Sequence, residues 1–333
     1  GWYSMFGTTT GYANVAIGLS ALQVQTTGHE NVAIGHQSLD ALTTGSLNTA
    51  IGRAAGGAVT TGNDNVALGY LALNLNTKSN RNVAIGSEAL KTLNVTSDTH
   101  VYNTAVGYAA GQAVTTGTLN TLIGGLTGDA LTTGGENVAV GYNALSTEDT
   151  GVGNVAVGRN ALTALNFDGN GYNTAVGYIA GAAVTTGVHN TFVGALAGDA
   201  TDDGGYNVAV GSAALSANCG DGNTAIGHAA GTAITGAKNT IVGLNAAYSK
   251  TSGDNVSCFG NDAGRVGSPG GQLTTESNRL SVCDENITRA DIQVDWTVAS
   301  DARDKTDFTA LDLGLDFVKA LAPVTYKWDK RSK

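Results

Sequence analysis

The sequence is poor in proline, aromatic residues and charge. Only 2 of its 333 residues are proline, 6% are aromatic and 13% are charged. The shortage of proline excludes a collagen-like chain, and the shortage of charge argues against a disordered one. Glycine, in contrast, occurs 48 times. An ordered fold must therefore use these glycines.

Positive charge is scarce as well. The formal net charge is −10 and the sequence pI is about 4.8. Proteins that bind the phosphate backbone of DNA or RNA need clustered lysine and arginine. We therefore expect no nucleic acid among the partners of this chain.

Long apolar runs and a recognisable leader are missing. No apolar run reaches the roughly 18 residues that a membrane-spanning helix needs, so we expect no membrane insertion. The first residues, Gly1, Trp2 and Tyr3, are neither an initiator methionine nor a signal peptide. We expect the sequence to be a fragment of a longer protein.

The cysteines do not form a recognisable site. Cys219, Cys258 and Cys283 include no CxxC pair and have no histidine at ligand spacing. We interpret them as ordinary small residues, and we expect neither a metal nor a cofactor.

A short motif recurs along most of the chain. Its pattern is Asn-(Val/Thr)-Ala-(Val/Ile/Leu), usually followed by Gly, and it predicts about fifteen coils of 16–17 residues. Extra residues occur only in 93–102 and 166–172, which carry turn residues, so we expect loops that bulge outward there. The leading asparagines are Asn14, Asn31, Asn48, Asn65, Asn82, Asn103, Asn120, Asn137, Asn154, Asn173, Asn190, Asn207, Asn223, Asn239 and Asn255.

The sequence also repeats with a period longer than one coil. The block that begins at Asn103 matches the block that begins at Asn173, 70 residues later. This match indicates that four coils were duplicated together.

Within a coil, the motif alternates as a short β-strand does. Val138 and Val140 share one face and Ala139 points to the other. Helices are the alternative, because alanine and leucine are good helix formers, but frequent glycine, β-branched residues and the lack of a 3.6-residue period favour strands. A single coil cannot bury a face, so neighbouring coils must cover it. The fold class predicted is all-β, a stacked-coil β-roll or β-helix rod, about 70 Å long at about 4.8 Å per coil.

The repeated residues predict how coils stack. The asparagines should form a ladder whose amides bond from coil to coil and satisfy the turns. The glycine four residues later should permit positive φ or the close approach of a neighbouring chain. We interpret alanine and glycine as a small-residue seam that packs against other copies of the chain. A threefold axis is the most plausible symmetry.

Over residues 14–260 the repeat resembles the NxAxG-type left-handed β-roll of trimeric autotransporter adhesin heads. Runs similar to NTAVGYxAG also occur in phage tail-fibre-like proteins. The resemblance implies a homotrimer whose surface binds host or matrix ligands, without locating a site.

The pattern stops near Gly260, and the remainder is expected to hold different units. Residues 261–299 are predicted to be a connector with strands at Arg279–Val282 and Ile292–Trp296. A short amphipathic helix is predicted within 309–321 and a strand at 324–328. The domains expected are therefore a shaft over 1–260, the connector over 261–299 and a third unit over 300–333, read as a small α+β fragment.

The third unit resembles the start of the intramolecular chaperone autopeptidase of phage endosialidases, tail spikes and fibres. The resemblance lies in Ser-Asp-x-Arg-x-Lys, a leucine-rich helix and Leu-x-Pro-Val-x-Tyr-x-Trp, in that order. It implies that Ser300 is the nucleophile, Lys305 its general base and Ala299–Ser300 the scissile bond.

A serine hydroxyl needs a base, and lysine serves only where its pKa is lowered. Arg303 could lower it, and Asp301 could orient the lysine or cap the following turn. The alternative is that Ser300 and Asp301 only cap a helix while Lys305 is solvated.

Three functions remain open. The first is a trimeric fibre shaft on a virion tail fibre or appendage, which binds a host surface glycan or protein receptor and matures by release of the chaperone. The second is an adhesin head on a bacterial surface. The third is a tail spike that degrades polysaccharide with paired carboxylates, for which Asp202–Asp203 and Glu148–Asp149 are candidates.

The acidic residues have a simpler interpretation. We expect these pairs to be solvated turn residues. Asp168-Gly169-Asn170 and Asp221-Gly222-Asn223 could bind Ca²⁺ weakly, but the calcium-binding nonapeptide repeat is missing, and we interpret both as turns.

Overall fold

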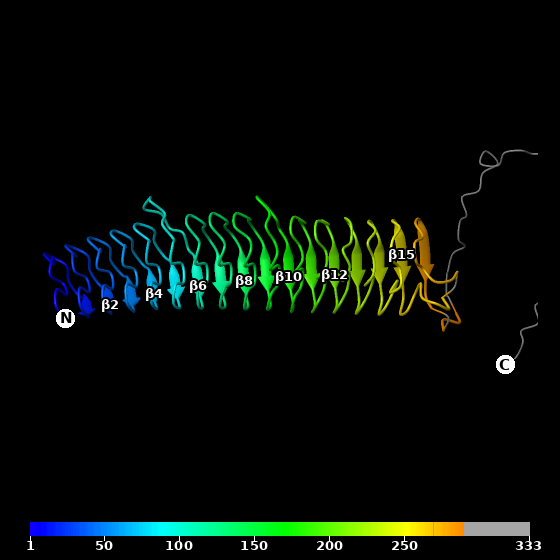
Figure 1. The fold of residues 1–333 in the computed structure, drawn as a ribbon, viewed down its shortest axis with the longest axis horizontal. Helices are drawn as coiled ribbons and strands as arrows, with labels where there is room; N and C mark the ends of the chain where they lie inside the picture. Colours follow the sequence, from blue (N-terminus) through cyan, green and yellow to red (C-terminus); the bar gives the residue numbers. More distant parts are fainter. Residues whose placement is uncertain (269, 285, 290–333) are drawn as a thin grey trace, which may run out of the picture. The chain divides into compact units, whose positions relative to one another are not determined.

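In the computed structural model, which describes residues 1–268, 270–284 and 286–289, the chain forms a parallel β-solenoid. One sheet holds sixteen strands in strict chain order (Figure 1). The strands are Val15–Ile17 (β1), Val32–Ile34 (β2), Thr49–Ile51 (β3), Val66–Leu68 (β4), Val83–Ile85 (β5), Thr104–Val106 (β6), Thr121–Ile123 (β7), Val138–Val140 (β8), Val155–Val157 (β9), Thr174–Val176 (β10), Thr191–Val193 (β11), Val208–Val210 (β12), Thr224–Ile226 (β13), Thr240–Val242 (β14), Val256–Phe259 (β15) and Arg279–Val282 (β16).

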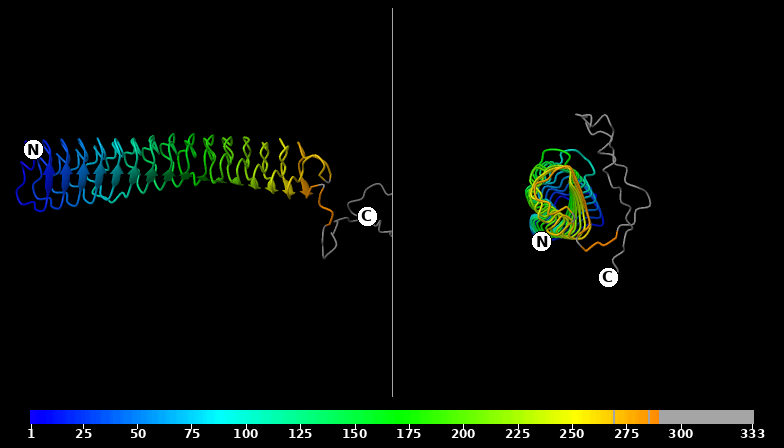
Figure 2. Two further views of the ribbon diagram at one scale, coloured as in Figure 1. Left: turned by 90° about the horizontal axis from the view of Figure 1, so that it is seen from below. Right: turned by 90° about the vertical axis from the view of Figure 1, so that its right-hand side faces the viewer.

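Each coil contributes one strand, and neighbouring strands pair in parallel register. Val138 pairs with Val155 and Ala139 with Ala156, so equivalent residues of successive coils form columns along the solenoid. Seen end on, the coils superimpose in one closed outline (Figure 2). The predicted all-β stacked-coil fold is confirmed, and the described residues contain no helix.

The two insertions bulge out of the stack, as their turn residues predict (Figure 1). Single parallel bridges, Asn80 with His100 and Val152 with Asn170, tie them to the preceding coil. The strand predicted at Arg279–Val282 also exists. It pairs with β15 and therefore extends the same sheet beyond residue 260.

The alanine in the middle of most strands faces the interior of the solenoid, and this corrects the predicted seam. Ala139 is completely buried in the single chain, whereas Val138 and Val140 on the other face are only half-buried. Alanine is small because the narrow interior leaves little room between the strand and the opposite wall of its own coil. The alanines cannot form the contact with another copy.

The glycine after each strand serves the stacking of coils within one chain. Gly177 has φ +149°, and a Cβ built on it would lie 2.3 Å from the carbonyl oxygen of Gly194 in the next coil. The positive φ was predicted correctly. The close approach, however, is to the next coil of the same chain and not to a neighbouring one.

The asparagines bridge each coil to both of its neighbours. Oδ1 of Asn137 accepts the backbone N–H of Asn154 at 2.9 Å, and its Nδ2 donates to the carbonyl of Gly151 at 2.8 Å. The same backbone-to-Oδ1 bond recurs from Asn31 to Asn239 at 2.8–3.3 Å. Such bonds satisfy backbone groups that are buried at every corner.

Asn255 is the exception in this ladder. Val256 takes the ladder position, and its N–H donates to Oδ1 of Asn239 at 3.0 Å. Asn255 lies one residue earlier, is exposed and bonds through Nδ2 to Oδ1 of Asn278 at 2.9 Å. Strand β15 is one residue longer than the strands before it, which is why counting from the motif places this asparagine one position off.

Candidate interaction face

The outer face of the sheet carries one column of residues, the third strand position, that is apolar in every coil of β1–β15. The first strand position carries valine or threonine, apart from serine in the coil of β15, and the third carries isoleucine, leucine, valine or, in β15, phenylalanine. Third-position residues that remain exposed are Ile17, Ile51, Ile85, Ile123, Val176, Val193, Val210, Ile226 and Phe259. We call this surface, the first and third strand positions of β1–β15, the outer sheet face.

Two further columns border the outer sheet face. The leading column is the residue before each ladder position: Ala13, Glu30, Leu47, Asp64, Arg81, Tyr102, Leu119, Glu136, Gly153, Tyr172, His189, Tyr206, Gly222, Lys238 and Asn255. The trailing column follows each strand-end glycine: Leu19, His36, Arg53, Tyr70, Ser87, Tyr108, Gly125, Tyr142, Arg159, Tyr178, Ala195, Ser212, His228, Leu244 and Asn261. All leading residues have positive φ, so each marks a corner from which the chain enters the strand.

Aromatic and cationic side chains stack within these columns. In the leading column, the ring of His189 lies 5.5 Å from Tyr172 and 5.0 Å from Tyr206, measured between centroids. In the trailing column, the guanidinium groups of Arg53 and Arg159 lie over Tyr70 and Tyr178 at 5.4 and 5.6 Å. Aromatic residues and arginine are enriched at protein interfaces. Part of each border thus carries residue types that are enriched at interfaces.

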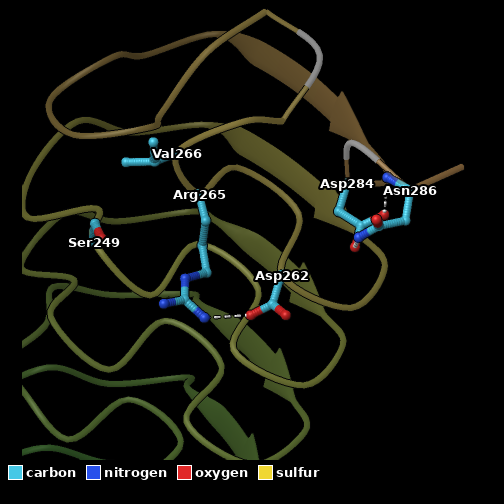
Figure 3. Close-up of a pocket in the computed structure, with 6 residues that line it drawn as sticks. All are labelled: Ser249, Asp262, Arg265, Val266, Asp284 and Asn286. Atoms are coloured by element: carbon cyan, nitrogen blue, oxygen red, sulfur yellow. Dashed lines mark hydrogen bonds and ion pairs between the residues drawn. The ribbon is translucent and has the colours of Figure 1, made fainter.

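A small hollow lies at the C-terminal end of the described solenoid. It has a volume of about 260 Å³ and is lined by Ser249, Asp262, Arg265, Val266, Asp284 and Asn286 (Figure 3). The guanidinium of Arg265 binds Oδ1 of Asp262 at 2.5 Å and also lies 5.4 Å from the ring centre of Tyr248. The hydrogen bond from Arg265 lowers the pKa of the Asp262 carboxyl. These two charges already neutralise each other.

Glu148, a candidate for paired carboxylate chemistry, is buried inside the coil. Its Oε1 accepts the N–H groups of Gly151 at 2.7 Å and Thr150 at 3.2 Å, and its Oε2 accepts the N–H of Phe167 at 3.2 Å. Burial raises the pKa of Glu148, and these hydrogen bonds oppose that rise. The expectation that Glu148 is solvated was therefore wrong. Its carboxylate acts as an internal cap and cannot reach a substrate.

Three of the other acidic turn residues bond to the next or previous coil. Oδ1 of Asp168 accepts the hydroxyl of Thr150 at 2.6 Å, and Oδ1 of Asp221 accepts the N–H of Gly205 at 2.8 Å. Asp202 accepts the hydroxyl of Thr185, and both Asp202 and Asp203 are exposed. Within the part of the chain that the structure describes, no group of three or more His, Cys, Asp or Glu side chains could hold a metal ion.

The three cysteines are not paired with one another. Cys219 and Cys258 are buried and Cys283 is half-buried. Burial raises the pKa of the Cys258 thiol to about 11. A thiol of this kind is unreactive near neutral pH, which agrees with its interpretation as an ordinary small residue. No helix in residues 1–268, 270–284 and 286–289 is long and apolar enough to cross a membrane.

The residues predicted for self-cleavage lie outside the described residues. These are Ala299, Ser300, Asp301, Arg303 and Lys305, together with the predicted elements at 292–296, 309–321 and 324–328. Their roles stay predictions.

The C-terminal end of the chain, which holds these residues, is similar to a known protein family. Residues 300–333 are similar to the peptidase S74 family, described as the chaperone of endosialidase. This segment is 34 of the 333 residues, about a tenth of the chain. No curated protein and no solved structure matches the sequence. A segment similar to this chaperone, together with a β-solenoid rod, fits a tail-fibre or tail-spike type of protein.

The outer sheet face is a candidate interaction surface that the sequence did not lead us to expect. The alternation of valine and alanine was read correctly, but the small side was assigned to the contact with other copies. The signal was available in the sequence, because the third position of the motif is isoleucine, leucine or valine in nearly every coil, and a continuous apolar column on a surface often marks an interaction site.

Proposed function

We propose that this chain forms the shaft of a homotrimeric fibre, of the tail-fibre or appendage type, whose outer sheet faces pack together around a threefold axis. The observation that carries the proposal is the unbroken apolar column at the third strand position of the outer sheet face. At about 4.8 Å per coil the face extends roughly 70 Å, and its two strand columns are about 7 Å apart, which gives roughly 500 Å². A patch of this size that contains a continuous apolar column is often an interaction site.

The bordering columns enlarge the contact. The step from leading to trailing column spans about six residues, so a contact that includes both covers more than roughly 1,000 Å² per copy. This exceeds the roughly 800 Å² per partner of a standard stable interface. Three copies can share such a face around one axis and leave the other walls of each coil free to contact a host surface glycan or protein.

The C-terminal segment supports a mechanism for assembly of the trimer. Its similarity to the chaperone of endosialidase supports a trimerising chaperone that releases itself after the shaft has formed. In this proposal the hydroxyl of Ser300, deprotonated by Lys305, attacks the carbonyl carbon of Ala299, and the C–N bond breaks as the nitrogen of Ser300 takes up the proton from Lys305. Water then hydrolyses the resulting ester, which leaves a carboxylate on Ala299 and the free hydroxyl and amine on Ser300. Arg303 keeps Lys305 unprotonated and Asp301 orients it.

Two measurements test these steps separately. Light scattering on the purified protein should give three times the chain mass, and a monomer would refute the fibre shaft. Mass spectrometry of the full-length gene product should show a species that ends at Ala299, and Ser300→Ala should abolish it. Ser281→Ala, a serine within β16, is the matched control and should leave cleavage intact. An uncut wild-type product would refute the autopeptidase but not the trimer.

A further inference from the structure

The two insertions lengthen the same corner of the coil at two points along the solenoid. We call residues 94–101 loop A and residues 166–171 loop B. The ladder asparagines are 21 residues apart across loop A and 19 across loop B, against 17 in most coils. Both loops replace the short turn before the leading column, and both bulge in the same direction (Figure 1). They precede Asn103 and Asn173, so the insertion repeats with the 70-residue period of the matching blocks.

The two loops are fixed to the preceding coil by the same backbone contacts. In loop A, the N–H of Asn80 donates to the carbonyl of Thr99 at 2.9 Å, and the N–H of Val101 donates to the carbonyl of Asn80 at 3.3 Å. Loop B repeats both bonds, at 2.9 and 3.1 Å, with Val152 as the residue of the preceding coil. The ends of the loops that lead into the strands therefore have the same arrangement, although the loops differ in length.

Each loop presents one aspartate at an equivalent place, five residues before the ladder asparagine. Oδ1 of Asp98 accepts Nδ2 of Asn80 at 2.6 Å, and Oδ1 of Asp168 accepts the hydroxyl of Thr150 at 2.6 Å. Both aspartates are exposed, and their Oδ2 atoms have no partner among the described residues. One oxygen of each carboxylate is thus held by the protein, and the other is open to a ligand.

An apolar side chain holds the first half of each loop. Val95 in loop A and Phe167 in loop B are partly buried and pack against the core of the solenoid. With the backbone bonds and the aspartate contacts, both halves of each loop are anchored. A loop that is ordered before its ligand arrives loses less conformational entropy on binding.

The exposed side chains of the loops suit a ligand rich in hydroxyl groups. Residues 96–100 of loop A are all exposed and polar, and loop B exposes Asn166, Asp168 and Asn170. Such side chains donate and accept hydrogen bonds, and a carboxylate forms the stronger, charge-assisted kind with a hydroxyl. Protein interfaces centre on aromatic and arginine anchors, which the exposed positions of these loops lack. The net charge of −10 disfavours an anionic ligand.

The two aspartates lie four coils apart. At about 4.8 Å per coil this is roughly 19 Å along the solenoid. The three turns between the loops are short, and they expose Thr116 and Thr133. A ligand that contacts both aspartates must present similar groups at this interval, as a polymer of repeating sugar units does.

We infer that loops A and B together bind one chain of a neutral surface polysaccharide, whose hydroxyl groups donate to the carboxylates of Asp98 and Asp168. This rests on the proposed function, in which walls other than the outer sheet face contact the host surface. The loops belong neither to that face nor to its bordering columns, so the proposed threefold packing does not use them. Contact at two points makes the second contact intramolecular and raises the apparent affinity.

Binding of the purified trimer to immobilised bacterial polysaccharides, one set neutral and one anionic, tests the ligand class. We expect binding to at least one neutral polysaccharide. Asp98→Asn and Asp168→Asn keep an oxygen for the anchoring bond and remove the charge, so each should weaken binding about five- to tenfold. Asp202→Asn is the matched control, since Asp202 is exposed and accepts the hydroxyl of Thr185 in a turn without an insertion. It should leave binding unchanged.

Three results of this experiment overturn the inference. They are binding to anionic polysaccharides alone, binding to none, and binding that neither loop variant weakens. Bacterial envelope fractions supply a further check on the class of partner. Binding that protease treatment abolishes, and that periodate cleavage of sugar diols leaves intact, would indicate a protein partner and would also overturn it.

Deletion of two coils tests whether one polysaccharide chain spans both loops. Removing residues 103–136 brings the loops to two coils apart, roughly 10 Å. Removing residues 173–206, the matching pair of coils, shortens the shaft equally and keeps the spacing of the loops. Both junctions join coils with a buried leucine, of the kind that already stack at Leu73 and Leu90.

The first deletion should lower the apparent affinity at least about tenfold, and the second should not change it. Equal affinities of the two deletion variants would overturn the inference. Light scattering on every variant separates these results from the proposed function. A trimer that fails the binding tests overturns the inference and leaves the fibre shaft standing, whereas a monomer refutes the shaft itself.

Discussion

The side-chain oxygen of Asn137 accepts the backbone N–H of Asn154 at 2.9 Å, one coil further along the solenoid. Asn137 is buried and also donates to Oδ1 of Asn120 at 3.2 Å and to the carbonyl of Gly151 at 2.8 Å. One side chain therefore joins three successive coils. Buried backbone groups need hydrogen-bond partners, and the asparagine ladder supplies these partners at the corners of the coils.

Asn137→Ala should destabilise the solenoid by about 2–4 kcal/mol, because it leaves a buried N–H and a buried carbonyl without partners at roughly 1–3 kcal/mol each. The free energy of unfolding from guanidinium titrations measures the effect. Asn170→Ala, at an exposed asparagine, should change it by no more than about 0.5 kcal/mol. Equal effects of the two substitutions would contradict the ladder.

Gly177→Ala should prevent normal stacking of the coils. The new Cβ would lie 2.3 Å from the carbonyl oxygen of Gly194, and φ is +149°. Since the obstacle is backbone, we expect a loss of several kcal/mol or insoluble protein. Gly125→Ala is the control, because its nearest atom is 3.8 Å away. Circular dichroism melting curves should separate the two variants clearly, and similar curves would argue against the stacking constraint.

Phe192 fills the interior next to two glycines. A Cβ on Gly198 would lie 2.6 Å from its ring and one on Gly181 would lie 2.9 Å from it. Phe192→Ala should destabilise the fold by about 3–5 kcal/mol through the cavity that it leaves. Phe192→Leu should cost clearly less, because Leu122 fills the same position in the matching block 70 residues earlier. A chemical unfolding series that ranks leucine with alanine would contradict this packing.

Glu148 should make stability depend on pH. Desolvation raises its pKa in the folded state above the ordinary value of 4.5. The folded state therefore holds the proton more tightly than the unfolded one, so stability falls as pH rises from the unfolded pKa through the folded pKa and is level above it. Glu148→Gln should remove this slope.

Gln25 already occupies the equivalent interior position of an earlier coil, so an amide fits there. Thermal melts between pH 4 and pH 8 provide the measurement, with the exposed Glu136→Gln as control. If the slope of Glu148→Gln matched that of the wild type, the carboxylate would not be its source.

The sequence by itself was enough to predict the length and the stacking of the coils. A motif that repeats at a nearly constant interval must place equivalent residues above one another, so the strands, the asparagine ladder and the two bulging insertions could be predicted without coordinates. The break in spacing at Asn255 was harder to read, because the motif there is shifted by one residue and only the pairing of Ser257 with Thr240 reveals it.

Only the tertiary structure decided which face of each strand is inside. The alternation of the motif shows that Ala139 and Val140 point to opposite faces of the strand. It does not show which of the two faces is inside the solenoid. Closure of the coil decides this, because buried leucine and valine of the opposite wall fill the interior and leave room for only alanine at the middle of most strands. Valine and isoleucine are thereby turned outward, and the apolar surface on which the proposed trimer depends follows from the width of the coil.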